Sequence, residues 1–406
     1  MSQQDLLDAA FSGDLERVEE LLQSGVFIDC LDKDGNTPLS RAIIQGHQRV
    51  VQALIKSGAS LNLLDSNNRT PLSCAAFYGH VKIVQTLVGA GVALDTPNSA
   101  NITPLFCATF HGHVKIVQIL VEAGAALDTP ISTNITPLSC AVYREYTEIV
   151  QILIDAGASP DTLDCQNQTP LSHAIIWGYH EIVQILVNAK ASLDLSGRHG
   201  LTPLFQAVLG GRSEVVRILA DAKASLDLSD QDDQTPLFWA ATRGHSKIVQ
   251  ILVDAGASFD LLDRCGLTPL FRATLALEDH FEVIRVLVDA KASLNISDQN
   301  GRTPLFEAVT FNHSKTVQIL VDAGAWIYSY DKYGENPWNI SFSKPAIRKI
   351  LMTSSNQHWH PEIHHLTSES TRRVVKITMA IWTCSEKTCL DHLPREMLFH
   401  IFNFLV

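Results

Sequence analysis

One tripeptide, Thr-Pro-Leu, recurs through most of the chain at a nearly fixed interval. Its copies begin at Thr37, Thr70, Thr103, Thr136, Thr169, Thr202, Thr235, Thr268 and Thr303. The interval is 33 residues seven times and then 35. One interval further lies Asn336 in ENPW, and one interval before the first copy lies Gln4 in QDLLDAA. A recurrence at this period is typical of a repeat array, and counting both ends gives eleven units.

Each unit contains the residues for two short helices. In residues 58–88, Thr70 is placed to cap a helix that tolerates Pro71, because the first helical N–H has no partner within the helix. Gly79 and His80 end that helix, and VKIVQTLV then has apolar residues at the spacing of a second helix with one buried face. The polar residues that follow predict an extended loop or hairpin. Such a pair cannot bury its own apolar face, so the units must stack into an all-α solenoid.

The period, the TPLxxA motif, the Gly-His pair and the following IVxxLV resemble the ankyrin repeat over residues 1–352. The resemblance implies about eleven helix-turn-helix units joined by hairpin loops. The unit that begins at Thr268 has two extra residues within TLALEDHFEV, which predicts a bulge between its helices. The family has His after Thr-Pro-Leu, whereas this chain has Ser or Phe there: Ser40, Ser73, Phe106, Ser139, Ser172, Phe205, Phe238, Phe271 and Phe306.

The resemblance also implies a concave groove, formed by the loop tips and the exposed side of the first helices. The positions seven and eight residues after each Thr lie on that face, and they are rich in aromatic residues in the first five Thr-Pro-Leu units. We expect them to bind a target protein, because aromatic and Arg side chains anchor most interfaces. The alternative is that several of these rings pack on their neighbours along the groove. The predicted target-binding residues are Ile44, Phe77, Tyr78, Phe110, His111, Tyr143, Arg144, Ile176 and Trp177.

Composition excludes several classes of partner. The net charge is −12 and no run is rich in Lys or Arg, so we expect neither nucleic acid nor a membrane surface as a partner. The first residues carry acids where a signal peptide needs a basic segment, and no apolar stretch is long enough to span a bilayer. We therefore expect a cytoplasmic protein. Cys74, Cys107 and Cys140 recur in register and are predicted to be small buried residues.

The array supplies no catalytic constellation, so we expect no enzyme, no cofactor and no metal. His47, His80, His113, His245 and His313 each follow the Thr by ten residues, and this regularity indicates a structural role. One other cluster contains the residue types that bind zinc but lacks a C-x-x-C pair, so a polar linker is favoured over a zinc site. The cluster consists of His358, His360, His364 and His365, followed by Cys384 and Cys389.

The last part of the chain differs from the repeats. Residues 353–370 are rich in Ser, His and Thr and are predicted to be a linker, and residues 371–406 are predicted to be helical. In HLPREMLFHIFNFLV, residues 392–406, Pro394 suits a first helical turn and the apolar residues form one wide face. Burying apolar surface contributes about 25 cal/mol per Å², so this face is expected to pack on something.

The segment from Leu393 to Leu405 resembles the first helix of an F-box. A truncated F-box at the end of an ankyrin array is similar to the PRANC arrangement of poxviral ankyrin proteins and of ankyrin effectors from intracellular bacteria. This implies a substrate receptor that docks the Skp-type adaptor of a cullin-RING (SCF) ubiquitin ligase, in the host cytosol if the protein is a pathogen effector. The implied adaptor-binding residues are Leu393, Pro394, Met397, Leu398, Ile401, Phe402 and Leu405.

Two alternatives to that assignment exist. A SOCS box is also found with ankyrin repeats, but Cys389 lies too close to Leu393 for both of its parts. The second alternative is an ankyrin scaffold without a ligase link, in which the last helix is a hydrophobic cap on the array.

Overall fold

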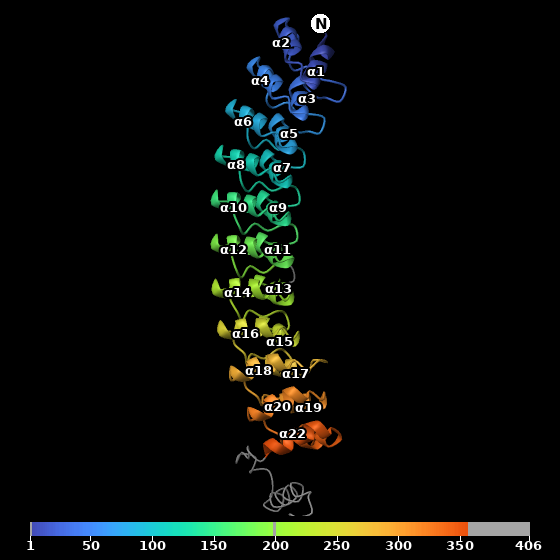
Figure 1. Cartoon of the computed structure of the whole chain (residues 1–406), viewed down its shortest axis with the longest axis vertical. Helices are drawn as coiled ribbons and strands as arrows, with labels where there is room; N and C mark the ends of the chain where they lie inside the picture. Colours follow the sequence, from blue (N-terminus) through green and yellow to red (C-terminus); the bar gives the residue numbers. More distant parts are fainter. Residues whose placement is uncertain (1, 198–199, 356–406) are drawn as a thin grey trace, which may run out of the picture. The chain divides into compact units, whose positions relative to one another are not determined.

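The computed structural model describes residues 2–197 and 200–355, and within that range the residues up to Ile347 form one compact unit (Figure 1). In the described residues all regular elements are helices, which confirms the all-α prediction. The first helices of the units are α1 (Gln3–Ser12), α3 (Pro38–Gln45), α5 (Pro71–Tyr78), α7 (Pro104–Phe110), α9 (Pro137–Tyr143), α11 (Pro170–Trp177), α13 (Pro203–Leu209), α15 (Pro236–Thr242), α17 (Pro269–Thr274), α19 (Pro304–Thr310) and α21 (Pro337–Ile340). The second helices are α2 (Leu15–Gln23), α4 (Gln48–Lys56), α6 (Val81–Gly89), α8 (Val114–Glu122), α10 (Thr147–Asp155), α12 (His180–Asn188), α14 (Ser213–Asp221), α16 (Ser246–Asp254), α18 (Phe281–Asp289), α20 (Ser314–Asp322) and α22 (Pro345–Ser355).

From α3 to α21 the first helix of each unit begins where the sequence predicts. From α3 to α19 the Thr of Thr-Pro-Leu is the N-cap, and its hydroxyl accepts a hydrogen bond from the backbone N–H three residues on. Asn336 caps α21 in the same way. At the amino end Ser2 is the N-cap of α1, so Gln4 lies inside the helix. Each such cap contributes about 1 kcal/mol.

Apolar residues are buried both within each unit and between neighbouring units. In the unit of α5 and α6, Leu72 and Ala75 of the first helix are fully buried, as are Val84 and Leu87 of the second. Helix α5 packs on α3 before it and α7 after it, and α6 packs on α4 and α8. A fully buried Leu or Val side chain contributes about 1.5–3 kcal/mol. Because this surface is shared between units, their stability depends on their neighbours.

A carboxylate or amide shapes most of the loops between units. At the start of the loop, the side-chain Oδ1 of one residue accepts hydrogen bonds from the backbone N–H groups two and four residues on. The residues that do this are Asp32, Asp65, Asn98, Asp164, Asp230, Asp263, Asp298 and Asp331. Ile131 and Gly197 hold the same position but offer no side-chain acceptor. Their backbone N–H and C=O groups still make the hydrogen bonds across the turn that the backbone of Asp65 makes in its loop. The loops are therefore the tight hairpin turns that the sequence predicts.

Two kinds of hydrogen bond that tie one unit to the next recur along the array. The Asp161 carboxylate accepts bonds from the backbone N–H and the hydroxyl of Ser192, and equivalent pairs recur along the array. His113 Nε2 lies 3.2 Å from the Phe77 carbonyl oxygen in the preceding unit. The ring of His113 lies against Gly79, where a Cβ atom would come within 2.7 Å of it. This contact explains the Gly-His pair and supports the structural role predicted for these histidines.

Of the two irregular parts of the array, the first follows the sequence and the second departs from the predicted boundary by three residues. Residues 275–280 join α17 to α18, whereas residues 79–80 join α5 to α6, and this is the predicted bulge. Leu277, on the bulge, is 93% exposed. At the other irregular place, α22 ends at Ser355, inside the predicted linker 353–370. The rest of the linker and the predicted helical segment 371–406 lie outside the described residues.

Candidate functional site

The nine predicted target-binding residues lie at the ends of five consecutive first helices. Ile44 is in α3, Phe77 and Tyr78 are in α5, and the others follow at equivalent places in α7, α9 and α11. His111 and Arg144 are the residues that cap the carboxyl ends of α7 and α9. Trp177 is the most exposed of the large apolar side chains in this set, at 59%. The set is therefore a row of accessible side chains along one edge of the helix stack.

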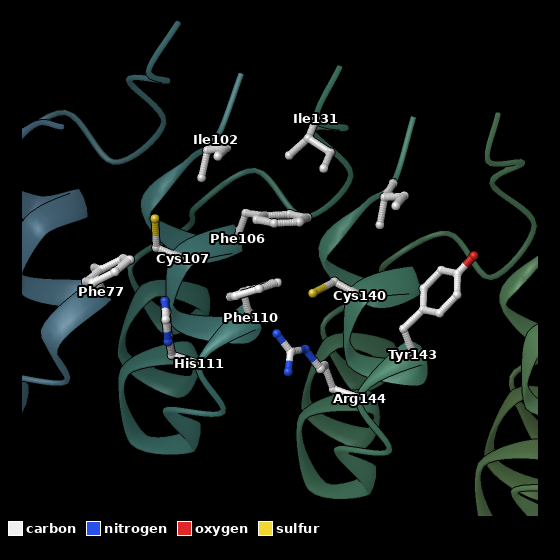
Figure 2. Close-up of a pocket in the computed structure, with 11 residues that line it drawn as sticks. Phe77, Ile102, Phe106, Cys107, Phe110, His111, Ile131, Cys140, Tyr143 and Arg144 are labelled. Carbon is white, nitrogen blue, oxygen red and sulfur yellow. The ribbon is translucent and has the colours of Figure 1, made fainter. Parts of the chain in front are cut away.

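Five of the nine residues line one cavity of about 420 Å³ between the units of α7 and α9 (Figure 2). They are Phe77, Phe110, His111, Tyr143 and Arg144. The other four, Ile44, Tyr78, Ile176 and Trp177, lie outside it. The remaining lining residues, which the sequence analysis did not assign to the groove, are Ile102, Phe106, Cys107, Ile131, Ile135 and Cys140.

The rings of the groove pack on one another in part. The Phe77 and His111 rings are 4.3 Å apart in an edge-on arrangement, and the Phe110 and His111 rings are 5.1 Å apart. The Arg144 guanidinium lies over the Phe110 ring at 4.1 Å. Phe110 nevertheless remains 40% exposed and Tyr78 41% exposed. Several rings therefore pack on their neighbours, as the alternative interpretation of the sequence expects, and they still offer apolar surface; whether they bind a target stays a prediction.

The units of α7 and α9 lack a polar contact that three other units make at the equivalent place. In those three units the residue four positions after the capping Thr reaches back to the Oδ2 atom of the loop aspartate. The Arg41 Nε donates to Asp32 at 2.7 Å, and the Trp239 Nε1 donates to Asp230 at 3.0 Å. In the units of α7 and α9 that position is Cys107 and Cys140, and the loop residue is Asn98 and Ile131. A short thiol replaces a long polar side chain, so space opens beneath the loop isoleucines.

The thiols in this cavity are chemically inert. Burial raises the pKa of Cys107 to about 11 and that of Cys140 to about 12, so both remain protonated at neutral pH. Burial, with smaller contributions from His113 and Arg144, lowers the pKa of His111, which keeps its ring uncharged. Protonated thiols are poor nucleophiles and poor metal ligands. The cavity can therefore bind an apolar group but offers no group poised for proton transfer or covalent chemistry.

Tyr143 is held at the edge of the cavity by a buried network. Its hydroxyl donates to Asp164 Oδ2 at 3.1 Å and lies 2.8 Å from His173 Nε2, and that ring nitrogen is 2.9 Å from the same carboxylate oxygen. Burial and the Asp164 carboxylate raise the pKa of Tyr143. Burial lowers the pKa of His173, against the opposing effect of Asp164. The hydrogen bonds of its hydroxyl therefore hold the Tyr143 ring in place beside the cavity, and the hydroxyl itself points away from the cavity toward the next unit.

The comparison with known families agrees with this architecture. A family model described as ankyrin repeats in three copies matches residues 6–98, 105–197, 157–232, 191–263 and 237–331. The chain belongs to the ankyrin-repeat family. Ankyrin arrays are protein-binding scaffolds, and the cavity of this one is lined in part by residues predicted to bind a target. A search of curated proteins found no match.

Two further properties of this ankyrin-repeat protein concern residues 2–197 and 200–355. None of the helices there has the length and apolar character that a bilayer span requires. In the same range, no three His, Cys, Asp or Glu side chains are grouped so that they could hold a metal ion. The predicted adaptor-binding residues and the His358 cluster lie outside the described residues.

Proposed function

We propose that this ankyrin-repeat protein is a substrate receptor of an SCF ubiquitin ligase. It captures a target protein in the groove along α5 to α11 and docks a Skp-type adaptor, and through it a cullin, by residues 393–405. The observation that carries the capture step is the apolar cavity between α7 and α9, flanked by the exposed Tyr78 and Trp177. Partly exposed aromatic side chains beside a preformed apolar cavity are the usual anchors of protein interfaces.

The docking step is supported by the sequence of the terminal segment. Leu393 and Pro394 open a run in which Met397, Leu398 and Ile401 continue one apolar face, as in the first helix of an F-box. An apolar face of this kind is stabilised when another protein covers it, at about 25 cal/mol per Å² of apolar surface buried. The cytosol is the compartment in which an SCF ligase would meet such a receptor.

The docking step is tested by measuring retention of the full chain on immobilised Skp-type adaptor. The Leu393→Ala, Pro394→Ala double variant removes the start of the apolar face, and His400→Ala is the matched control because it changes a polar residue of the same segment. We expect the intact chain and the control to be retained and the double variant to be lost, while all three give the same circular dichroism and melting temperature.

The scaffold alternative predicts a different pattern in the same experiment. If the terminal segment only caps the array, the intact chain is not retained by the adaptor, and the double variant melts at a lower temperature than the control. Either result removes the ligase link and leaves a protein-binding array.

A further inference from the structure

The cavity between α7 and α9 lies in a stretch of the groove that is nearly free of charge. The loop tips and first helices of its two units, residues 96–111 and 129–144, contain a single Asp, Glu, Lys or Arg, which is Arg144. Asp95 and Asp128 lie just before these ranges, where their carboxylates accept hydrogen bonds from backbone N–H groups of the next unit, and Glu145 follows the second range. The units on either side carry carboxylates at the same loop position, Asp65 and Asp164. In a chain of net charge −12, this is a local window in which the one formal charge is positive.

Arg144 is accessible and is not neutralised by a carboxylate. In residues 2–197 and 200–355, no Asp or Glu oxygen lies within ion-pairing distance of its guanidinium. Arg69, which precedes the cap of α5, differs because its guanidinium is bound by the Asp65 carboxylate at 2.9 Å. Arg144 instead lies flat over the Phe110 ring at 4.1 Å, which orients the guanidinium at the side of the cavity. Its hydrogen-bond donors remain available to an incoming acceptor.

The cavity has two halves. Figure 2 shows Phe106 and Phe110 between the two thiols, with Cys107, Phe77 and His111 on one side and Cys140, Arg144 and Tyr143 on the other. The loop isoleucines contribute the wall above each half. The two halves are lined mainly by the successive units of α7 and α9, with Phe77 contributed by the unit of α5, and the first helices of neighbouring units pack against each other at roughly 8–10 Å. Two apolar side chains of one peptide segment can span that distance, whereas one side chain cannot fill both halves.

We infer that the occupant of this cavity is a peptide segment of the target that carries apolar side chains next to a carboxylate, which Arg144 binds. This inference rests on the proposed capture function and adds the chemistry of the target. The apolar side chains replace water in the two halves of the cavity, and the carboxylate accepts hydrogen bonds from the guanidinium beside it. The scarcity of acidic side chains in this window keeps an anionic segment from being repelled there.

The test is a selection from a phage-displayed library of random dodecapeptides against the full-length chain, repeated against two folded variants. Arg144→Glu reverses the charge at the cavity. Ile131→Asp installs the residue that other units carry at this loop position, so the loop can gain its usual side-chain acceptor while a negative charge is added beside the cavity. Arg243→Glu is the matched control, since Arg243 has the equivalent position in the unit of α15 and also lies over an aromatic ring, that of Trp239.

The inference predicts that the intact chain and Arg243→Glu enrich the same peptides, with aromatic or long aliphatic residues beside Asp or Glu. For one selected peptide, Arg144→Glu and Ile131→Asp weaken binding by roughly tenfold to a hundredfold. When the peptide carboxylate is replaced by an amide, Arg144→Ala no longer changes the affinity for that peptide. Enriched apolar peptides without an acidic residue, bound equally by Arg144→Glu, would overturn the inference and leave target capture intact. No enrichment by the intact chain would overturn target capture itself.

Discussion

The contact between a Gly in one unit and the His of the next can be tested by adding one methyl group. Gly79 has a φ of +80°, and a Cβ atom there would lie 2.7 Å from Cε1 of His113. Gly91 has a φ of +77° and open space around the same position, so Gly91→Ala is a matched control. A left-handed backbone costs an L-residue about 1–2 kcal/mol at either site. Only Gly79→Ala also displaces the His113 ring.

The additional cost at Gly79 comes from the hydrogen bond that the displaced ring makes. His113 Nε2 lies 3.2 Å from the Phe77 carbonyl oxygen, and losing a bond of this kind costs about 0.5–1.5 kcal/mol. Gly79→Ala is therefore expected to destabilise the array by roughly 1 kcal/mol more than Gly91→Ala. In a His113→Ala background that difference should disappear, because the ring is no longer there to be displaced.

Native-state hydrogen exchange of the amides in α5 to α8 is the suitable assay. A long array need not unfold in one step, so a local opening free energy is better defined than a single unfolding free energy. Equal costs for Gly79→Ala and Gly91→Ala would refute the reasoning, as would a difference that persists in the His113→Ala background. Either result would mean that the Gly-His pair does not couple neighbouring units in the way the geometry indicates.

Three further predictions concern pH, thiol reactivity and capping. Burial lowers the pKa of His173, so its contribution to stability is complete above about pH 6.5 and falls as the pH drops below that value. The variant His173→Gln copies Gln206 of the next unit. In urea denaturation at a series of pH values, this variant should lose less stability below about pH 6.5 than the unchanged chain. At neutral pH a thiol-alkylating reagent should modify the exposed Cys165 and Cys265 and spare the buried Cys107 and Cys140, as peptide mass spectrometry would show. Thr169→Ala removes the cap of α11 and should reduce the opening free energy of that helix by about 1 kcal/mol in hydrogen exchange.

The parts of the fold that could be predicted are those fixed by local chemistry. Thr followed by Pro defines a helix start within one turn of chain, and the spacing of Ile83, Val84 and Leu87 defines the buried face of α6 without knowledge of any neighbour. The bulge after α17 follows from counting residues. None of these features needs the position of a residue from another unit.

The parts of the site that were missed depend on contacts between units. Ile131 and Ile135 are loop residues, where helical spacing gives no information, yet they form a wall of the cavity. The sequence did contain one signal: Ile131 stands at a loop position where the neighbouring units have Asn or Asp. The hydroxyl of Tyr143 binds Asp164 and His173 of the following unit, and no local pattern predicts such a pairing.

The most direct test of the account asks whether one chain holds both partners at the same time. Immobilised Skp-type adaptor is loaded with the full chain, and a peptide selected on the cavity is then added while binding is followed by interferometry. The account predicts that the peptide binds the adaptor-held chain as tightly as the free chain, that Arg144→Glu removes only the peptide, and that Leu393→Ala with Pro394→Ala removes only the adaptor. A chain that the adaptor does not hold, or peptide and adaptor that exclude each other, would contradict it.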